Sequence, residues 1–179
     1  MEELKVKTVI ISKQGETSEN YEKLKKIVNN EKIKIQVVKK GDRIKIEKDI
    51  HIDILWPNNS KIINENILNN NSIVCKLQYK SFSALFTGDI ENIAENQILE
   101  DYNGKTQLLN STILKVAHHG SKTSTTQEFL DAVKPKIALI GVGKDNNFGH
   151  PNDEVIKRLE NMRHKNLSYR QNGRDISDD

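Results

Sequence analysis

The chain has 179 residues, of which 35% are hydrophobic and 30% charged, with a formal net charge of +3. This is enough for one domain with a hydrophobic core. No apolar stretch approaches the roughly 20 residues of a membrane-spanning helix, and the first residues do not resemble an export signal, so we expect a soluble piece. The single cysteine, Cys75, excludes an internal disulfide and a multi-cysteine zinc site. The lysines are scattered among acidic residues, so composition alone does not indicate nucleic-acid binding.

The first third of the chain is predicted to contain a strand, a helix and three further strands. Residues 5–11 form a short apolar run, and residues 19–29 have the spacing of an amphipathic helix. Apolar residues then recur with period two from residue 33 to residue 54, interrupted by turn signals at Gly41-Asp42 and Lys48-Asp49. We expect three short strands here, pairing as antiparallel neighbours.

The rest of the chain repeats a pattern of strand, polar cluster and helix. The asparagine-rich residues 57–71 are predicted to form a surface loop, followed by two neighbouring strands at residues 72–79 and 82–86. The three polar clusters are Thr87-Gly88-Asp89 before a helix at 91–99, His118-His119-Gly120-Ser121 before a helix near 126–133, and Phe148-Gly149-His150-Pro151 before a helix near 153–160. The segment 172–174 is predicted to be a turn that precedes a clipped final strand.

Polar residues that follow successive strands are expected to form one site, because loops at a common edge of an α/β sheet converge. The candidates are Asp89, the pair His118 and His119, and His150. Each alone also has a structural explanation, Asp89 as a helix cap and the histidines as loop or surface residues. Together they favour a metal hydrolase site, since carboxylate and imidazole groups bind Zn²⁺ or Mn²⁺ and activate water.

Three segments resemble consecutive motifs of the metallo-β-lactamase-fold domain of ComEC-type DNA-uptake (competence) proteins. The segments are LFTGDIE at residues 85–91, LKVAHHGSKTS at 114–124 and FGHP at 148–151, and NSIV at 71–74 resembles the family segment upstream of them. The resemblance implies an α/β fold, a four-layer αββα sandwich. Residues 1–179 would be its C-terminal half, a single truncated domain with a mixed sheet and flanking helices.

The resemblance also implies a site with two divalent cations, zinc or manganese, in the intact parent protein. The aspartate that matches Asp89 would bridge both ions. We favour His119 as the second metal ligand and His118 as a catalytic neighbour that contacts a phosphate or protonates a leaving group, but the order within the pair stays open. Substrate-binding roles are expected for the remaining candidates, which are Asn71, Ser121, Lys122 and His150.

One departure from the family is large: the superfamily motif His-x-His-x-Asp-His is absent. The five histidines are His51, His118, His119, His150 and His164, and none of them forms His-x-His or Asp-His. We therefore expect weak or no metal binding and little hydrolase activity from this segment alone. Half a sandwich also leaves an apolar sheet face uncovered, which the missing N-terminal half-domain or a second copy of the chain would bury.

Three functions are consistent with these observations. The resemblance implies a phosphodiesterase or nuclease that acts on DNA during uptake, as a soluble extension of a bacterial membrane protein. A second hypothesis is a non-catalytic nucleic-acid-binding or assembly module that retains the fold. A third is a hydrolase of another small phosphoester or a lactone, because a fold alone does not choose among reactions.

Overall fold

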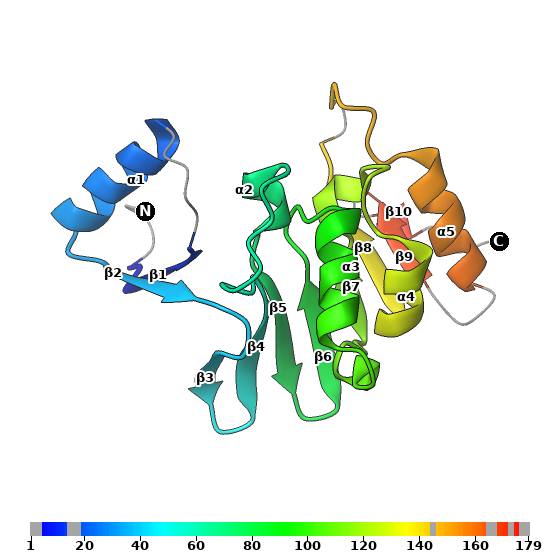
Figure 1. Cartoon of the computed structure of the whole chain (residues 1–179), viewed down its shortest axis with the longest axis horizontal. Coiled ribbons are helices and arrows are strands. Elements are labelled where there is room, and N and C mark those ends of the chain that lie inside the picture. Colours follow the sequence, from blue (N-terminus) through cyan, green and yellow to red (C-terminus); the bar gives the residue numbers. More distant parts are fainter. Residues whose placement is uncertain (1–4, 14–18, 144–145, 164–167, 172–173, 176–179) are drawn as a thin grey trace.

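The computed structural model describes residues 5–13, 19–143, 146–163, 168–171 and 174–175 (Figure 1). The first described elements are β1 (Thr8–Ser12), α1 (Glu19–Asn30) and β2 (Lys34–Val38), which form a small unit of their own. β1 and β2 pair in parallel, with Thr8 opposite Lys34. The prediction that β2 pairs antiparallel with the strands after it was therefore wrong. A helical crossover returns the chain to its starting edge, which makes consecutive strands parallel.

The remaining strands form one eight-stranded mixed sheet in the order β10-β9-β8-β7-β6-β5-β4-β3. The strands are β3 (Arg43–Glu47), β4 (Ile50–Trp56), β5 (Val74–Tyr79), β6 (Phe82–Phe86), β7 (Ile113–Lys115), β8 (Ile137–Ile140), β9 (Ser168–Gln171) and β10 (Arg174–Asp175). Neighbours from β3 to β6 are antiparallel, neighbours from β6 to β9 are parallel, and β10 pairs antiparallel with β9. The predicted adjacency of β5 and β6 is confirmed.

Three helices of the second half lie together in front of the parallel strands in Figure 1. They are α3 (Asn92–Asp101), α4 (Gln127–Val133) and α5 (Asp153–Arg163), and a short α2 (Ile67–Asn70) interrupts the predicted loop 57–71. The core joins Leu85, Leu114 and Ala138 of the sheet to Ile98, Phe129 and Leu159 of the helices, all of them at most 1% exposed. The predicted fold class, α/β with a mixed sheet and flanking helices, is confirmed.

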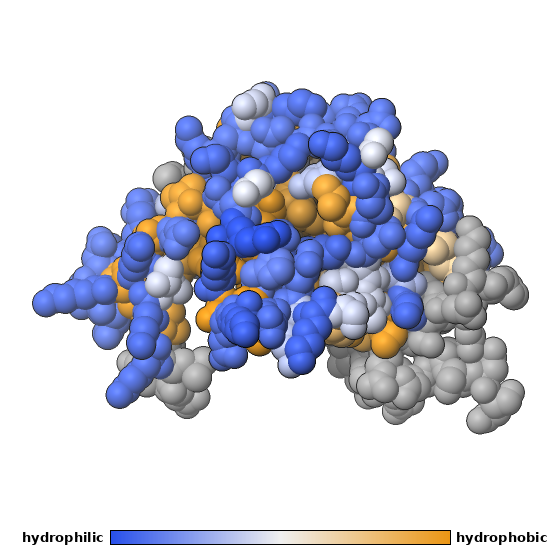
Figure 2. All heavy atoms as spheres, turned by 90° about the horizontal axis from the view of Figure 1, so that it is seen from below, coloured by the Kyte–Doolittle hydropathy of each residue, from blue (hydrophilic) through white to orange (hydrophobic). Residues whose placement is uncertain are grey.

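The opposite face of the sheet carries a second apolar row, because successive side chains of a strand point to opposite faces. The register aligns Ile52, Leu77, Ala84, Ile113 and Ile137 across β4 to β8. On the same face, Tyr79 and Phe86 are each 44% exposed. Figure 2 shows hydrophobic side chains, in orange, that reach the surface between hydrophilic ones. The large aromatic residues Tyr79 and Phe86 on this face are thus open to solvent.

A buried carboxylate ties the small unit to the large sheet. Asp101, at the end of α3, accepts hydrogen bonds from Lys61 Nζ at 2.8 Å and Asn58 Nδ2 at 2.9 Å, and forms an ion pair with Lys40 Nζ at 2.8 Å. Burial raises the pKa of Asp101, but the hydrogen bonds from Lys40, Lys61 and Asn58 outweigh burial and lower it to about 2. Lys40 follows β2, so this contact fixes the connection between the two sheets.

Two further observations concern the ends of the chain and the membrane. The predicted turn at residues 172–174 lies mostly outside the described residues, since 172 and 173 are not described, and the short β10 follows it. Strand β9 was not predicted.

Within the described ranges, no helix is both long enough and apolar enough to cross a bilayer.

Candidate functional site

The two adjacent histidines lie on a tight turn directly after β7. Residues Ala117–Gly120 form a short 3₁₀ segment in which His118 has φ 47° and His119 has φ 55°. This left-handed conformation costs a non-glycine residue on the order of 1 kcal/mol and is concentrated at functional sites. His118 N donates to Gly88 O at 3.1 Å, which joins this turn to the end of β6. The turn leaves the His118 side chain partly buried and the His119 side chain exposed.

Asp89 follows a glycine that permits a close approach of two segments. Gly88 has φ +57°, and a Cβ on it would lie 2.8 Å from Cβ of Ser72. A glycine is therefore required where the end of β6 passes the segment before β5. Helix α3 begins at Asn92 with Glu91 in the cap position, so Asp89 lies before the cap. Its carboxylate is half-exposed at the strand end.

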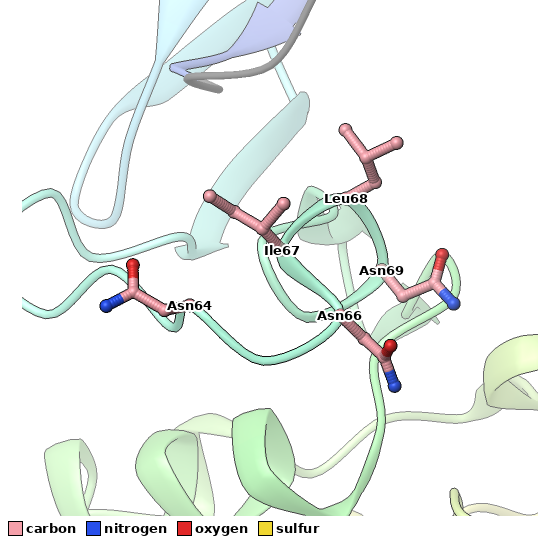
Figure 3. A pocket seen from close by; sticks show the side chains of 5 residues that line it. All are labelled: Asn64, Asn66, Ile67, Leu68 and Asn69. Carbon is pink, nitrogen blue, oxygen red and sulfur yellow. The ribbon is translucent and has the colours of Figure 1, made fainter.

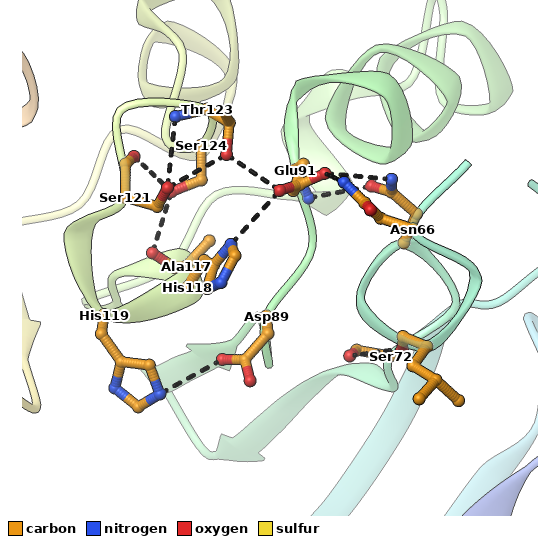
Figure 4. A network of polar contacts seen from close by, with 12 residues as sticks. Asn66, Ser72, Asp89, Glu91, Ala117, His118, His119, Ser121, Thr123 and Ser124 are labelled. Carbon is orange, nitrogen blue, oxygen red and sulfur yellow. Dashed lines mark hydrogen bonds and ion pairs between the residues drawn. The ribbon is translucent and has the colours of Figure 1, made fainter. Parts of the chain in front are cut away.

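Asp89 and His119 face each other, as Figure 4 shows. Oδ1 of Asp89 lies 3.5 Å from Nε2 of His119, and Nδ1 of His119 lies 2.5 Å from the carbonyl oxygen of Gly141. A carbonyl oxygen only accepts, so Nδ1 carries a proton and the lone pair of Nε2 in the neutral ring points toward the carboxylate. Two acceptors at this separation fit a cation between them. Metal bonds of about 2 Å at a tetrahedral angle separate two ligand atoms by about 3.3 Å.

His150 reaches the same cluster from the third loop. Its ring meets that of His118 edge to face, with centroids 5.8 Å apart, and stacks on Phe148 at 6.0 Å. A Cβ on Gly120 would lie 2.7 Å from Cβ of Pro151, so the glycine allows the two loops to pack together. Burial lowers the pKa of His150, and the electrostatic influence of the neighbouring His118 and His119 lowers it further.

The structure therefore brings the four main predicted residues together at the carboxyl ends of β6, β7 and β8, as strand-end convergence predicted. Two predicted substrate-binding residues are engaged in the loops instead. Asn71 is buried, and its amide nitrogen donates to the carbonyl oxygens of Ile63 at 2.7 Å and Ile67 at 2.8 Å. Ser121 is buried with its hydroxyl 3.0 Å from Thr123 Oγ1, whereas Lys122 is exposed.

Two buried carboxylates beside the cluster were missed by sequence reasoning. Glu91 accepts hydrogen bonds from Asn66 Nδ2 at 2.7 Å and Thr123 Oγ1 at 3.0 Å. Glu95 is fully buried and accepts from the backbone N–H groups of Thr125 at 2.5 Å and Thr126 at 2.8 Å. Burial raises the pKa of Glu95, and these hydrogen bonds oppose that effect. The only sequence signal for Glu91 was its place at the end of the LFTGDIE segment.

A lysine is also close to Asp89. Lys115 is the last residue of β7, and its Nζ donates to the carbonyl oxygen of Val116 at 2.8 Å. Burial lowers the pKa of Lys115, whereas the negative charge of Asp89 raises it. The negative charge of Asp89 thus acts on Lys115, and its carboxylate lies beside the imidazole of His119.

An asparagine-lined hollow lies next to the cluster. It is lined by Asn64, Asn66, Ile67, Leu68 and Asn69 (Figure 3). Asn66 links it to the histidine cluster through Glu91. Among the described residues, no group of three or more His, Cys, Asp or Glu side chains is arranged to hold a metal ion. In the cluster at the strand ends, Asp89 and His119 are thus a pair of side chains that could contribute two ligands to a metal ion.

The fold and this cluster define an α/β protein with an ionisable site at the carboxyl ends of its parallel strands, and comparison with known proteins identifies the family. No family model matches the chain. It is 32% identical over 169 residues to ComE operon protein 3 of Bacillus subtilis, which covers 94% of this chain and 21% of that protein. It is 36% identical over 110 residues to Recombination protein 2 of Haemophilus influenzae, covering 62% of the chain and 13% of that protein.

Competence protein ComA of Neisseria gonorrhoeae is 32% identical over 110 residues, covering 62% of the chain and 15% of that protein. The predicted resemblance is confirmed: the chain is homologous to a segment of the ComEC-type competence proteins. It spans about a fifth of the length of ComE operon protein 3. A crystal structure of a diphosphatase from the PhnP family is 12% identical, with a TM-score of 0.41, covering 96% of this chain and 59% of that one.

Proposed function

We propose that this chain supplies half of the active site of a metal-dependent phosphodiesterase that cuts DNA during uptake, within a longer competence protein. The observation that carries the proposal is the pairing of Asp89 with a His119 ring whose Nδ1 is held by a backbone carbonyl. Histidines that bind metals are usually oriented by such a second hydrogen bond. The competence and recombination names of the relatives support DNA as the substrate.

Asp89 and His119 would hold part of the coordination shell of zinc or manganese. When bound, such ions polarise a phosphoryl oxygen and lower the pKa of water. The other ligands would come from the upstream half-domain that the resemblance implies, because no group of three or more ligand-type side chains among the described residues is arranged to hold a metal ion. The same half-domain would cover the apolar row of Ile52, Leu77 and Ile113 on the open sheet face, and a second copy of the chain is the alternative occupant.

The neighbouring residues would act on the substrate itself. The ring of His118 lies between Glu91 and His150, where its outward nitrogen can take up a proton from a reacting group and pass it to the leaving oxygen. His150 and the exposed Lys122 would bind phosphate oxygens. Asn71 and Ser121 would contribute by shaping the loops around the histidines, since their side chains form hydrogen bonds within those loops.

The test is to express this chain together with an upstream half-domain that carries His-x-His-x-Asp-His and to assay DNA cleavage with Mn²⁺ or Zn²⁺. We expect metal-dependent cleavage that Asp89→Ala and His119→Ala each abolish. His51→Ala changes a histidine outside the cluster and should cleave normally. Cleavage that survives Asp89→Ala would overturn the proposal, and DNA binding without cleavage would favour the non-catalytic nucleic-acid-binding module instead.

A further inference from the structure

Glu91 is held by hydrogen bonds to two segments of the chain, the α2 segment and the loop that contains Thr123. Its side chain is 8% exposed. Oε2 accepts from Asn66 Nδ2 at 2.7 Å and from Asn70 Nδ2 at 3.4 Å, while Oε1 accepts from Thr123 Oγ1 at 3.0 Å. Its own backbone N–H donates to Asn70 Oδ1 at 3.0 Å. Hydrogen bonds from this many donors fix the direction of the carboxylate.

The ring of His118 lies against that carboxylate. Nδ1 of His118 is 3.5 Å from Oε1 of Glu91, and among the described residues the buried Nδ1 has no hydrogen-bond partner of good geometry. A proton on Nδ1 is attracted by the negative oxygen, whereas an unprotonated Nδ1 would place a lone pair against it. The carboxylate therefore favours one of the two neutral tautomers of the ring.

We propose that Glu91 is a positioning residue that keeps His118 protonated on Nδ1, so that the lone pair of Nε2 points toward Asp89. Figure 4 shows Nε2 on the side of the ring that faces away from Glu91 and toward Asp89. In both adjacent histidines an acceptor oxygen then lies at Nδ1 and leaves the lone pair on Nε2. The acceptor is the Glu91 carboxylate for His118 and the Gly141 carbonyl for His119. The inference rests on the proposed function only in taking the cluster of Asp89, His118, His119 and His150 as the active site.

The tautomer can be measured in the whole chain without metal or DNA, by long-range ¹H–¹⁵N correlation of the imidazole rings. The measurement is made well above the ordinary histidine pKa of roughly 6.5, so that the rings are neutral. The His118 signals are assigned by their loss in His118→Ala. We expect an unprotonated Nε2 and a protonated Nδ1 in the unsubstituted chain.

The isosteric variant Glu91→Gln should reverse this state. Asn66 and Asn70 both donate to the Oε2 position, so the carbonyl oxygen of glutamine belongs there and its NH₂ group points toward His118. That NH₂ would donate to Nδ1 and move the proton to Nε2. Thr123→Val is the matched control: it removes another contact to Oε1 and loosens the same loop, but it keeps the carboxylate. We expect the Nδ1 tautomer to persist in this control.

Three outcomes would overturn the inference: a proton on Nε2 in the unsubstituted chain, an unchanged tautomer in a folded Glu91→Gln, or the same switch in Thr123→Val. The first needs no substitution of Glu91, so the test stands even if Glu91→Gln does not fold. None of these results depends on DNA cleavage. The failure of this inference is therefore distinguishable from the failure of the proposed function.

Discussion

Oδ1 of Asp89 and Nε2 of His119 lie 3.5 Å apart, although they come from loops that follow different strands. The Asp89 loop is placed by the glycine at 88, and the His119 loop by its left-handed turn and its contact with Gly141. Parallel pairing of β6 with β7 brings the two loops to one edge of the sheet. The separation therefore follows from the topology and does not depend on a long, mobile side chain.

The first prediction concerns metal binding by the chain alone. We expect weak binding of Zn²⁺ in titration calorimetry, because two ligands leave most of the coordination shell to water. His119→Ala should weaken it at least about tenfold, which corresponds to roughly 1.4 kcal/mol. His51→Ala, a histidine of β4 outside the cluster, should leave it unchanged. Tight binding that Asp89→Ala abolishes would show that the chain holds more ligands than this pair.

The second prediction concerns the packing of the two histidine loops. Gly120→Ala should destabilise the chain by about 2–4 kcal/mol, because alanine is strained at φ +81° and its Cβ would lie 2.7 Å from Pro151. Gly104→Ala is the matched control, with φ +73° and open space around the new Cβ. Gly104→Ala should cost only about 1 kcal/mol, which is the cost of placing alanine in a left-handed backbone conformation. Equal losses in urea unfolding would show that the loops do not pack as described.

Much of the fold was predictable from the sequence, because the strand, polar cluster and helix pattern repeats clearly from β6 to α5. The strand that pairs with β2 was not predictable, because apolar residues at every second position identify a strand but do not show which strand lies next to it. Strand β9, with the sequence SYRQ, has no apolar alternation to reveal it. Glu91 was missed for a similar reason: its importance depends on burial under Asn66 and Asn70, which only the tertiary structure creates.

The third prediction concerns the open face of the sheet. We expect the chain to self-associate at high concentration through the apolar row on β4 to β8, as measured by light scattering. Phe86→Ser should weaken this association. Ile62→Ser is the matched control, because Ile62 is equally exposed, at 44%, but lies in the loop before α2. A chain that stays strictly monomeric, or two variants with the same effect, would count against this surface as an interface.

The last prediction concerns pH and the Asp101 carboxylate. Its pKa is about 2 in the folded chain against an ordinary value of 3.8, because the hydrogen bonds from Lys40, Lys61 and Asn58 outweigh its burial. An acid with a lowered folded pKa binds protons less readily when folded. Its stabilisation is therefore complete above about pH 4 and is lost as the pH falls toward 2. The shift corresponds to about 2 kcal/mol.

Urea unfolding at about pH 7 and at several values between roughly 4 and 2 measures this contribution. Asp101→Asn should lower the stability at neutral pH by about 2 kcal/mol and should flatten the acid part of the curve by the same amount. Glu19→Gln removes an exposed ion pair with Lys23 and should change neither the neutral value nor the slope by more than about 0.5 kcal/mol. If Asp101→Asn kept the full acid loss, other carboxylates would have to be responsible, and Asp101 would not be the residue that fixes the small unit to the sheet.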